Sequence, residues 1–236
     1  MYILAAGSLK SVWPRLMARW PQAATIQQTH FGPAGLLCEA ITAGRRCDLF
    51  ASANQAHPQS LLAAGIAHKI MPFATNSLCL TVRAERCDED DNWLTLLRRT
   101  DLRLATSTAG CDPSGDYSLS LFSRIARDDP SLGAQLLSRA MPLVGGRDSL
   151  PVPAGQLAAG WLLEQDFADM FIGYASYRPQ LEQLPSLRVF TIPPHYNPQA
   201  IYTLALLNPA AGELARYLCS ADAADVLTAS GFNADV

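Results

Sequence analysis

The sequence predicts an α/β protein with a mainly parallel sheet. Short β-rich apolar runs alternate with stretches of helical periodicity along almost the whole chain, which is the pattern of βαβ units. The chain has 236 residues, of which 49% are hydrophobic and 17% charged, so it can bury one large core or two smaller ones.

The first elements are expected to alternate between strand and helix. They are a strand at 2–5, a helical stretch at 9–20, a helix from 33 to 44, a strand at 48–51 and a helix from 57 to 65. Pro14 removes a backbone donor inside the first helical stretch and therefore predicts a kink there. Pro33 is expected at the first helical position of the next helix, which Gly44 ends.

A second set of units follows a polar stretch at 85–92 that we expect to be a surface loop. A strand at 77–82 leads out of the first set, and the elements after the loop are helix 92–100, strand 102–107, helices 115–127 and 131–140, strand 141–144, helix 155–165, and strands 168–174 and 187–192. The Pro-rich segment 193–198 is expected to cross back before a strand at 201–207 and two closing helices.

This order predicts two α/β lobes joined by two crossover segments. Lobe I comprises residues 1–76 plus 194–236, and lobe II comprises residues 77–193. Because α/β sheets bind ligands at the carboxyl ends of their strands, we expect the ligand in a cleft between the lobes.

Composition and short motifs exclude several classes of protein. The net charge of -3 and the scattered 18 Lys and Arg residues give no basic surface for nucleic acid. No apolar run approaches the roughly 20 residues that span a bilayer. The six cysteines form no C-x-x-C pair and have no histidines at metal spacing, so no zinc site and no cofactor are expected. Residues 1–6 are too short for the apolar part of a signal peptide, so we expect a periplasmic protein whose export signal was removed, or a cytoplasmic one.

Four turns before helices are rich in small residues that let a ligand approach the backbone. They are residues 5–8, 31–35, 51–54 and 112–116. A helix start offers N–H donors and the positive end of a dipole, so several such turns together predict an anion site. Each turn alone is also typical of ordinary helix capping.

The ordered set of these motifs resembles the molybdate- and tungstate-binding proteins of ABC importers. The resemblance runs from A-A-G-S-L at 5–9 through F-G-P-A-G at 31–35, G-R-R-C-D-L-F-A-S-A-N at 44–54, D-P-S-G-D-Y at 112–117 and D-M-F-I-G-Y at 169–174 to residues 221–232. It implies the type II periplasmic binding-protein fold and a dehydrated tetrahedral oxyanion, molybdate or tungstate, held by neutral donors without direct metal coordination.

The resemblance also implies which residues bind the anion. The implied ligand residues, with backbone N–H or hydroxyl donors, are Ser8, Ala34, Ala53, Ser114, Gln156 and Tyr174. At Ala34 the best-known members have a second ligand serine, so this chain keeps only the N–H there and the choice of anion stays open.

Some of these side chains have structural alternatives. Ser8 is also a plausible helix cap, and Tyr174 a core tyrosine. Asp112 and Asp116 are better explained by an Asx-turn and a helix start than by an acid pair. No serine and histidine form a nucleophile elbow, so a hydrolase is disfavoured. Arg147, beside two glycines, is a candidate to reach the cleft.

The resemblance implies a monomeric solute-binding protein, not an enzyme, that docks on an ABC permease in the membrane. The alternative is a cytosolic ligand sensor of the same fold with another anionic ligand, because six cysteines suit a reducing compartment.

Overall fold

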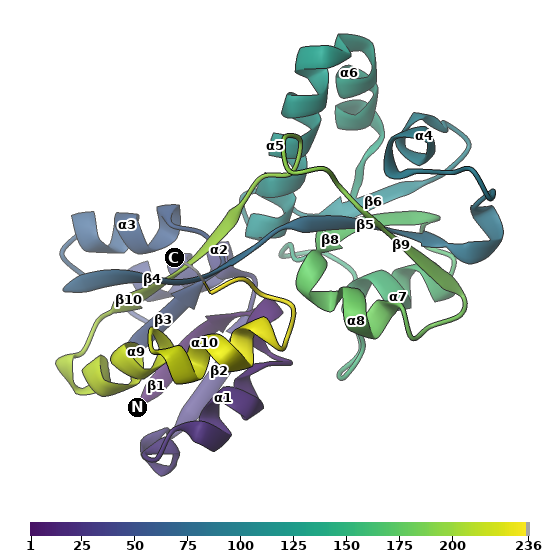
Figure 1. The fold of residues 1–236 in the computed structure, drawn as a ribbon. Coiled ribbons are helices and arrows are strands. Elements are labelled where there is room, and N and C mark those ends of the chain that lie inside the picture. The colour runs from purple at the N-terminus through teal and green to yellow at the C-terminus, as the bar shows by residue number, and fades with distance from the viewer. Residues whose placement is uncertain (235–236) are drawn as a thin grey trace. The chain divides into compact units, whose positions relative to one another are not determined.

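The computed structural model describes residues 1–234 and divides the chain into two compact units. Unit 1 contains Met1–Asn76 and the described residues from Ala200 onward, and unit 2 contains Ser77–Gln199. The units are described separately below (Figure 1).

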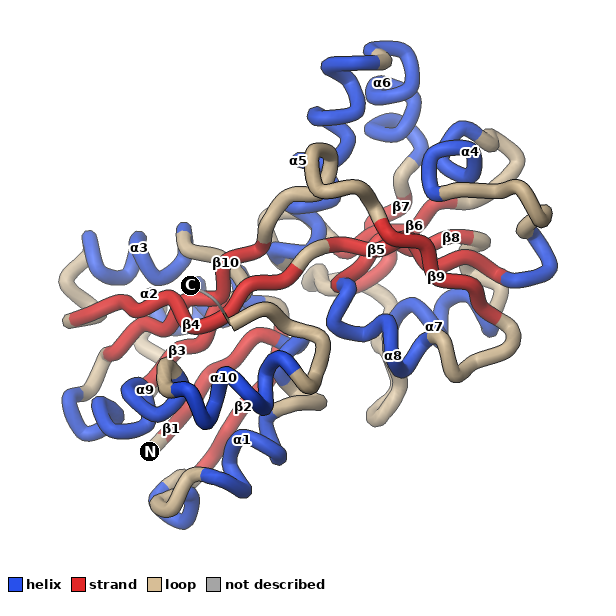
Figure 2. The backbone as a smooth tube through the Cα atoms, in the orientation of Figure 1, coloured by secondary structure: helices blue, strands red, loops and turns tan. Residues whose placement is uncertain are grey.

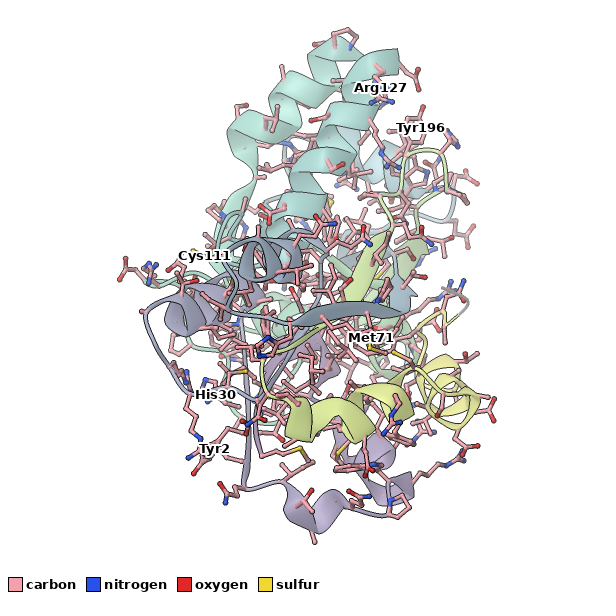
Figure 3. All side chains as sticks on the ribbon, turned by 90° about the vertical axis from the view of Figure 1, so that its left-hand side faces the viewer. Tyr2, His30, Met71, Cys111, Arg127 and Tyr196 are labelled. Carbon is pink, nitrogen blue, oxygen red and sulfur yellow. The ribbon has the colours of Figure 1, made fainter. Side chains whose placement is uncertain are left out.

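The return crossing comes later than the sequence predicts, because residues 194–199 belong to unit 2. The Tyr196 hydroxyl donates to Asp128 Oδ2 at 2.6 Å, and Arg124 Nη1 donates to the Asn197 carbonyl at 2.8 Å. Figure 3 shows Tyr196 beside the end of the helix that carries Arg127. These contacts, which the composition of the segment does not reveal, place the boundary at 199/200 instead of 193/194.

Unit 1 is built on a five-stranded sheet in the order β2-β1-β3-β10-β4. The strands are β1 (Tyr2–Ala6), β2 (Gln28–Gly32), β3 (Leu49–Ser52), β4 (Lys69–Asn76) and β10 (Ala200–Leu206). The first three in chain order are parallel, and β10 runs antiparallel between β3 and β4. Parallel β1, β2 and β3 therefore end at one edge of the sheet.

Helices cover both faces of this sheet. They are α1 (Trp13–Arg19), α2 (Ala34–Thr42), α3 (Ala56–Ala63), α9 (Gly212–Leu218) and α10 (Ala221–Thr228), with 3₁₀ turns η1 (Gly7–Leu9), η2 (Ala23–Thr25) and η5 (Pro209–Ala211). In Figure 1, α2 and α3 lie on one face and α1, α9 and α10 on the other.

Unit 2 repeats this sheet with the order β7-β6-β8-β5-β9. The strands are β5 (Leu78–Arg83), β6 (Leu104–Ser107), β7 (Met141–Val144), β8 (Met170–Tyr174) and β9 (Leu187–Thr191). Here β6, β7 and β8 are parallel, and β5 runs antiparallel between β8 and β9. In each unit, the antiparallel strand is the one that enters from the other unit.

The helices of unit 2 also form a layer on each face of its sheet. They are α4 (Trp93–Arg98), α5 (Pro113–Asp128), α6 (Pro130–Arg139), α7 (Ala158–Glu164) and α8 (Arg178–Leu181), with 3₁₀ turns η3 (Ala84–Arg86) and η4 (Ala175–Tyr177). Figure 2 shows α7 and α8 on one face of the strands and α5 with α6 on the other. No helix within residues 1–234 is long and apolar enough to cross a membrane.

A buried aspartate precedes the third parallel strand in each unit. Asp48, 6% exposed, accepts the Tyr2 N–H at 2.7 Å and the Asn208 side-chain amide at 2.8 Å. Asp169, 4% exposed, accepts the backbone N–H and the Nε–H of Arg103, both at 2.9 Å. Each carboxylate thus ties the start of its strand to the segment that begins the neighbouring strand.

Several predicted elements differ from those observed. Pro14 causes no kink, because α1 begins at Trp13 and the proline lies in its first turn, where no helical donor is lost. Pro33 occupies the N-cap position just before α2, and Ala34 is the first helical residue. The strands β2 and β4 were not predicted. The helix expected at 155–165 begins only at Ala158.

Candidate functional site

The candidate site in unit 1 lies where β1, β2 and β3 end. The register pairs Ala6 with Gly32 and Ala5 with Ala51, so the three following turns start at the same edge. Ser8, Ala34 and Ala53, the three residues predicted in this unit, follow these strands directly. The fold therefore brings them to one edge, as parallel strands require.

Ser8 lies in the 3₁₀ turn after β1 and is 7% exposed. Its Oγ is 2.7 Å from the hydroxyl of Tyr202, which is completely buried on β10. Asn76, the last residue of β4, donates from Nδ2 to the same phenol at 3.5 Å. Sequence reasoning missed Tyr202 and Asn76, because neither lies in a turn motif; the only signal was a tyrosine inside a mainly aliphatic strand.

Ala34 begins a nine-residue helix whose start differs from that of most capped helices. Pro33 occupies the cap position and, among the described residues, no side chain accepts a hydrogen bond there. A helix start carries N–H groups that its own turns do not satisfy. Ala34 itself is 1% exposed, so its N–H is offered at a buried, apolar position.

Ala53 lies in a turn that is fixed by its neighbours' side chains. Asn54 Oδ1 accepts the His57 N–H at 3.1 Å and the Ser52 hydroxyl at 3.1 Å. Ser52 Oγ is also 3.4 Å from His57 Nδ1. Ser52 is completely buried, so this Ser-His contact orders the backbone around Ala53 and does not present a nucleophile.

The start of α5 in unit 2 is capped by a carboxylate. Ser114, 3% exposed, donates its N–H to Asp112 Oδ1 at 3.1 Å, so the predicted donor already has an internal acceptor. Burial raises the pKa of Asp112 to about 6, and Asp116 adds to this, while hydrogen bonds from Ser114 and Ser107 oppose it. The Asx-turn interpretation of Asp112 is therefore confirmed.

The turn after β7 packs closely against this carboxylate. Gly145 has φ +77°, and a Cβ there would come within 2.7 Å of Asp112 Oδ2. The next N–H, that of Gly146, donates to Ser149 Oγ at 2.7 Å. Arg147 is exposed at the tip of this turn. Only a glycine fits beside Asp112 at this position.

The two remaining predicted residues, Tyr174 and Gln156, differ in burial and in their place in the fold. Tyr174 ends β8, next to β6, and is 5% exposed. Gln156 is exposed two residues before α7, and its N–H donates to the Pro153 carbonyl at 3.2 Å. The prediction that Gln156 donates from the start of a helix is thus wrong, because the helix starts later and the turn uses that N–H.

Within residues 1–234, no group of three or more His, Cys, Asp or Glu side chains is arranged to hold a metal ion. The cysteines are free thiols: Cys38, Cys47 and Cys79 are buried, and Cys219 is exposed. Burial raises the pKa of Cys47 and of Cys79 to about 12, so both remain protonated at neutral pH.

Two α/β units with this strand order, linked by two crossing segments, define the type II periplasmic binding-protein fold. The chain belongs to the bacterial extracellular solute-binding protein family, whose model matches residues 1–233. It is 47% identical over 209 residues to an uncharacterised protein of Pasteurella multocida (strain Pm70), covering 87% of this chain and 86% of that protein.

Two solved structures show how far the fold is shared. The periplasmic molybdate-binding protein of Azotobacter vinelandii superposes with a TM-score of 0.74 at 17% identity, over 98% of each chain. The sulfate-binding protein SubI of Mycobacterium tuberculosis H37Rv gives 0.76 at 16% identity, over 98% of this chain and 85% of that one. At such identities the likeness concerns the fold.

Proposed function

We propose that this protein is the periplasmic solute-binding subunit of an ABC importer and captures a tetrahedral oxyanion, molybdate or tungstate, without changing it chemically. The observation that carries the proposal is the edge of unit 1 where three strand-to-helix turns meet. There Ser8 and Ala34 are buried, and α2 starts without a side-chain cap. Neutral N–H and O–H donors in such a place suit a dehydrated anion.

Both structural neighbours support this ligand class, since one is a molybdate-binding and the other a sulfate-binding protein. The family adds the solute-binding role. We further propose that the protein acts as a monomer that delivers its ligand to a membrane permease, with donors drawn from the turns of each unit.

Asp112 favours a second candidate, a sensor or binding protein of the same fold for another anionic ligand. A carboxylate that accepts the Ser114 N–H at 3.1 Å competes for that donor with a fully deprotonated oxyanion. A ligand that carries a proton can instead donate to the carboxylate. Phosphate and organic phosphates therefore belong in the test beside molybdate.

The test is calorimetry and native mass spectrometry of the whole chain against molybdate, tungstate, sulfate, phosphate and a phosphorylated organic acid. Binding of molybdate or tungstate in preference to phosphate is the expected result. Preference for a protonated ligand supports the second candidate, and absence of binding across the panel contradicts the oxyanion proposal.

One variant and its control ask whether unit 2 contributes a donor. Tyr174→Phe in unit 2 is expected to weaken anion binding by about tenfold or more, because a hydrogen bond to a charged group contributes about 1.5–3 kcal/mol. Gln156→Ala is its control within the same unit, since the exposed side chain precedes α7, and it should leave the affinity unchanged. Unchanged binding by Tyr174→Phe would place this hydroxyl outside the site.

A further inference from the structure

Three buried polar groups in unit 1 form a chain of hydrogen bonds that ends at Ser8. Asn76 Nδ2 lies 3.5 Å from the Tyr202 hydroxyl, which lies 2.7 Å from Ser8 Oγ. The three residues are 5%, 0% and 7% exposed. They come from the end of β4, from β10 and from the turn after β1, so no local sequence motif connects them.

Aromatic packing fixes the tyrosine ring in this chain. Phe73 contacts the ring edge to face with centroids 6.3 Å apart, and Phe232 does so at 5.4 Å. The segment around Phe232 is tied to β4, because Asn233 donates to the Thr75 carbonyl at 2.9 Å. With its ring held from both sides, the Tyr202 hydroxyl cannot move away from Ser8 without disturbing the core.

The Asn76 amide favours Tyr202 as the donor to Ser8. An N–H group can only donate, so at the Asn76 contact the phenol oxygen of Tyr202 is an acceptor. A phenol that accepts such a bond is polarised into a better donor, and its oxygen lies 2.7 Å from Ser8 Oγ, a contact in which either oxygen can donate. With the phenolic hydrogen on this contact, Ser8 Oγ accepts it and the hydroxyl hydrogen of Ser8 remains for another acceptor.

We propose that Tyr202, directed by Asn76, is a positioning residue that makes Ser8 a hydrogen-bond donor to the bound anion. The inference rests on the proposed oxyanion-binding function. Were Ser8 to donate to Tyr202, it would present only lone pairs to an anion, which would repel it. Donation from Tyr202 to Ser8 therefore favours tetrahedral anions whose oxygens are all acceptors, and disfavours those that must donate a proton to Ser8.

The central experiment is calorimetry of Tyr202→Phe with the tightest-binding anion of the panel. The phenylalanine keeps the ring contacts with Phe73 and Phe232 and removes only the hydroxyl. We expect affinity to fall about tenfold, the scale of one hydrogen bond to an anion. The matched control is Tyr217→Phe, which removes a hydroxyl that donates to the Leu16 carbonyl at 2.8 Å, and should leave affinity unchanged.

A double variant and a selectivity measurement separate positioning from a general loss of structure. In a Ser8→Ala background, Tyr202→Phe should cost less than about twofold further, because there is no serine left to orient. The ratio of sulfate or molybdate affinity to phosphate affinity should shrink in Tyr202→Phe, since a freely rotating Ser8 can accept a proton from phosphate. A purely structural role would not change this ratio.

Should Tyr202→Phe fail to fold in thermal melts, Asn76→Ala carries the test, with an expected loss of about threefold. Parent-like affinity in the folded variants, or fully additive losses in the double variant, overturns the positioning role while leaving oxyanion binding intact. A parent chain that binds no member of the panel overturns the proposed function, and the inference falls with it.

Discussion

In unit 1 the carboxylate before β3 accepts hydrogen bonds from neutral groups, whereas in unit 2 the equivalent carboxylate before β8 is bound by arginine. The first turns of the helices also differ between the units. In unit 1, α2 starts at Ala34 without a side-chain cap, and in unit 2, α5 starts with Asp112 bonded to Ser114. One strand order thus accommodates a helix start without a side-chain cap and another whose donor already has its own acceptor.

The largest effect is expected from the packing of α5 in unit 2. A Cβ on Gly115 would lie 2.4 Å from the backbone N of Ala109 and 2.6 Å from the Ser107 carbonyl. Backbone cannot yield as a flexible side chain does, so Gly115→Ala should lower the free energy of unfolding by about 3 kcal/mol or more. Urea denaturation measures this.

The control is Gly212→Ala in unit 1, where no atom lies within 4 Å of the added Cβ. It begins α9, so it should stabilise the chain slightly, by up to about 1 kcal/mol. Equal effects from both substitutions would contradict the close approach of α5 to the end of β6.

The paired aspartates provide a direct comparison between the units. Burial alone would raise the pKa of Asp169, but the hydrogen bonds and charge of Arg103 outweigh it and lower that pKa. Asp169→Asn should cost about 2 kcal/mol of unfolding free energy, since it removes the charge of a buried carboxylate that accepts hydrogen bonds from Arg103, whose side chain is 43% exposed. Asp48→Asn, whose partners are neutral, should cost about 1 kcal/mol.

The pH dependence of these two variants adds a second measurement. A lowered pKa means that Asp169 contributes stability above its unfolded pKa, and that this stability is lost as the pH falls through the folded pKa. Melts of Asp169→Asn and the parent should therefore converge at acidic pH. Divergence that grows toward low pH would argue against the ion pair.

Asp112 should show the reverse dependence on pH. Its pKa is raised to about 6, so the stability it contributes below the unfolded pKa is lost as the pH rises from about 4 to about 6. Asp112→Asn keeps an oxygen to cap α5 and removes the ionisation, so it should stabilise the chain at pH 7 by about 2 kcal/mol. Thermal melts between pH 4 and pH 7 measure the difference.

Asp129, the cap of α6, serves as the control for Asp112. The Leu132 N–H lowers the pKa of Asp129, so Asp129→Asn should lose stability at neutral pH instead of gaining it.

The groups that face Asp112 are Ser107, Ser114, Asp116 and Tyr177, of which Asp116 and Tyr177 can ionise. If both aspartate variants change in the same direction, burial of Asp112 does not control its ionisation.

The smallest effect is expected where α2 begins. Ala34→Ser adds a hydroxyl at the uncapped start, and should tighten molybdate or tungstate by about three- to tenfold if the turn faces the anion. Ala43→Ser, at the exposed C-terminal end of the same helix, should leave the affinity unchanged. Weaker binding by Ala34→Ser would indicate a pocket shaped for alanine and a different ligand.

Much of the fold could be predicted because buried strands and amphipathic helices leave periodic patterns, but the two edge strands of unit 1 could not. The edge strand β2 has no fully buried residue and no apolar run. In β4, Pro72 interrupts the strand pattern because it lacks a backbone donor, yet β4 lies at the edge next to β10, where a missing donor is tolerated beside a register shift at Tyr202 and Thr203.

The candidate site could also be predicted only in part from the sequence. Ser8, Ala34 and Ala53 could be identified because small residues after strands form local motifs. The contact between Ser8 and Tyr202 joins residues 194 positions apart, and only the tertiary fold reveals it. Gln156 was misplaced because nothing in its Gly- and Pro-rich surroundings signals where α7 begins.

The entry of β10 into unit 1 has a consequence for biosynthesis. Until residues 200–206 leave the ribosome, β3 lacks one neighbour and β4 lacks its only strand partner in the sheet. Unit 2 is continuous in sequence and can complete its sheet first. The nascent protein therefore carries an unfinished N-terminal half with an open, apolar strand edge through most of translation, the condition under which chaperones are recruited and aggregation begins.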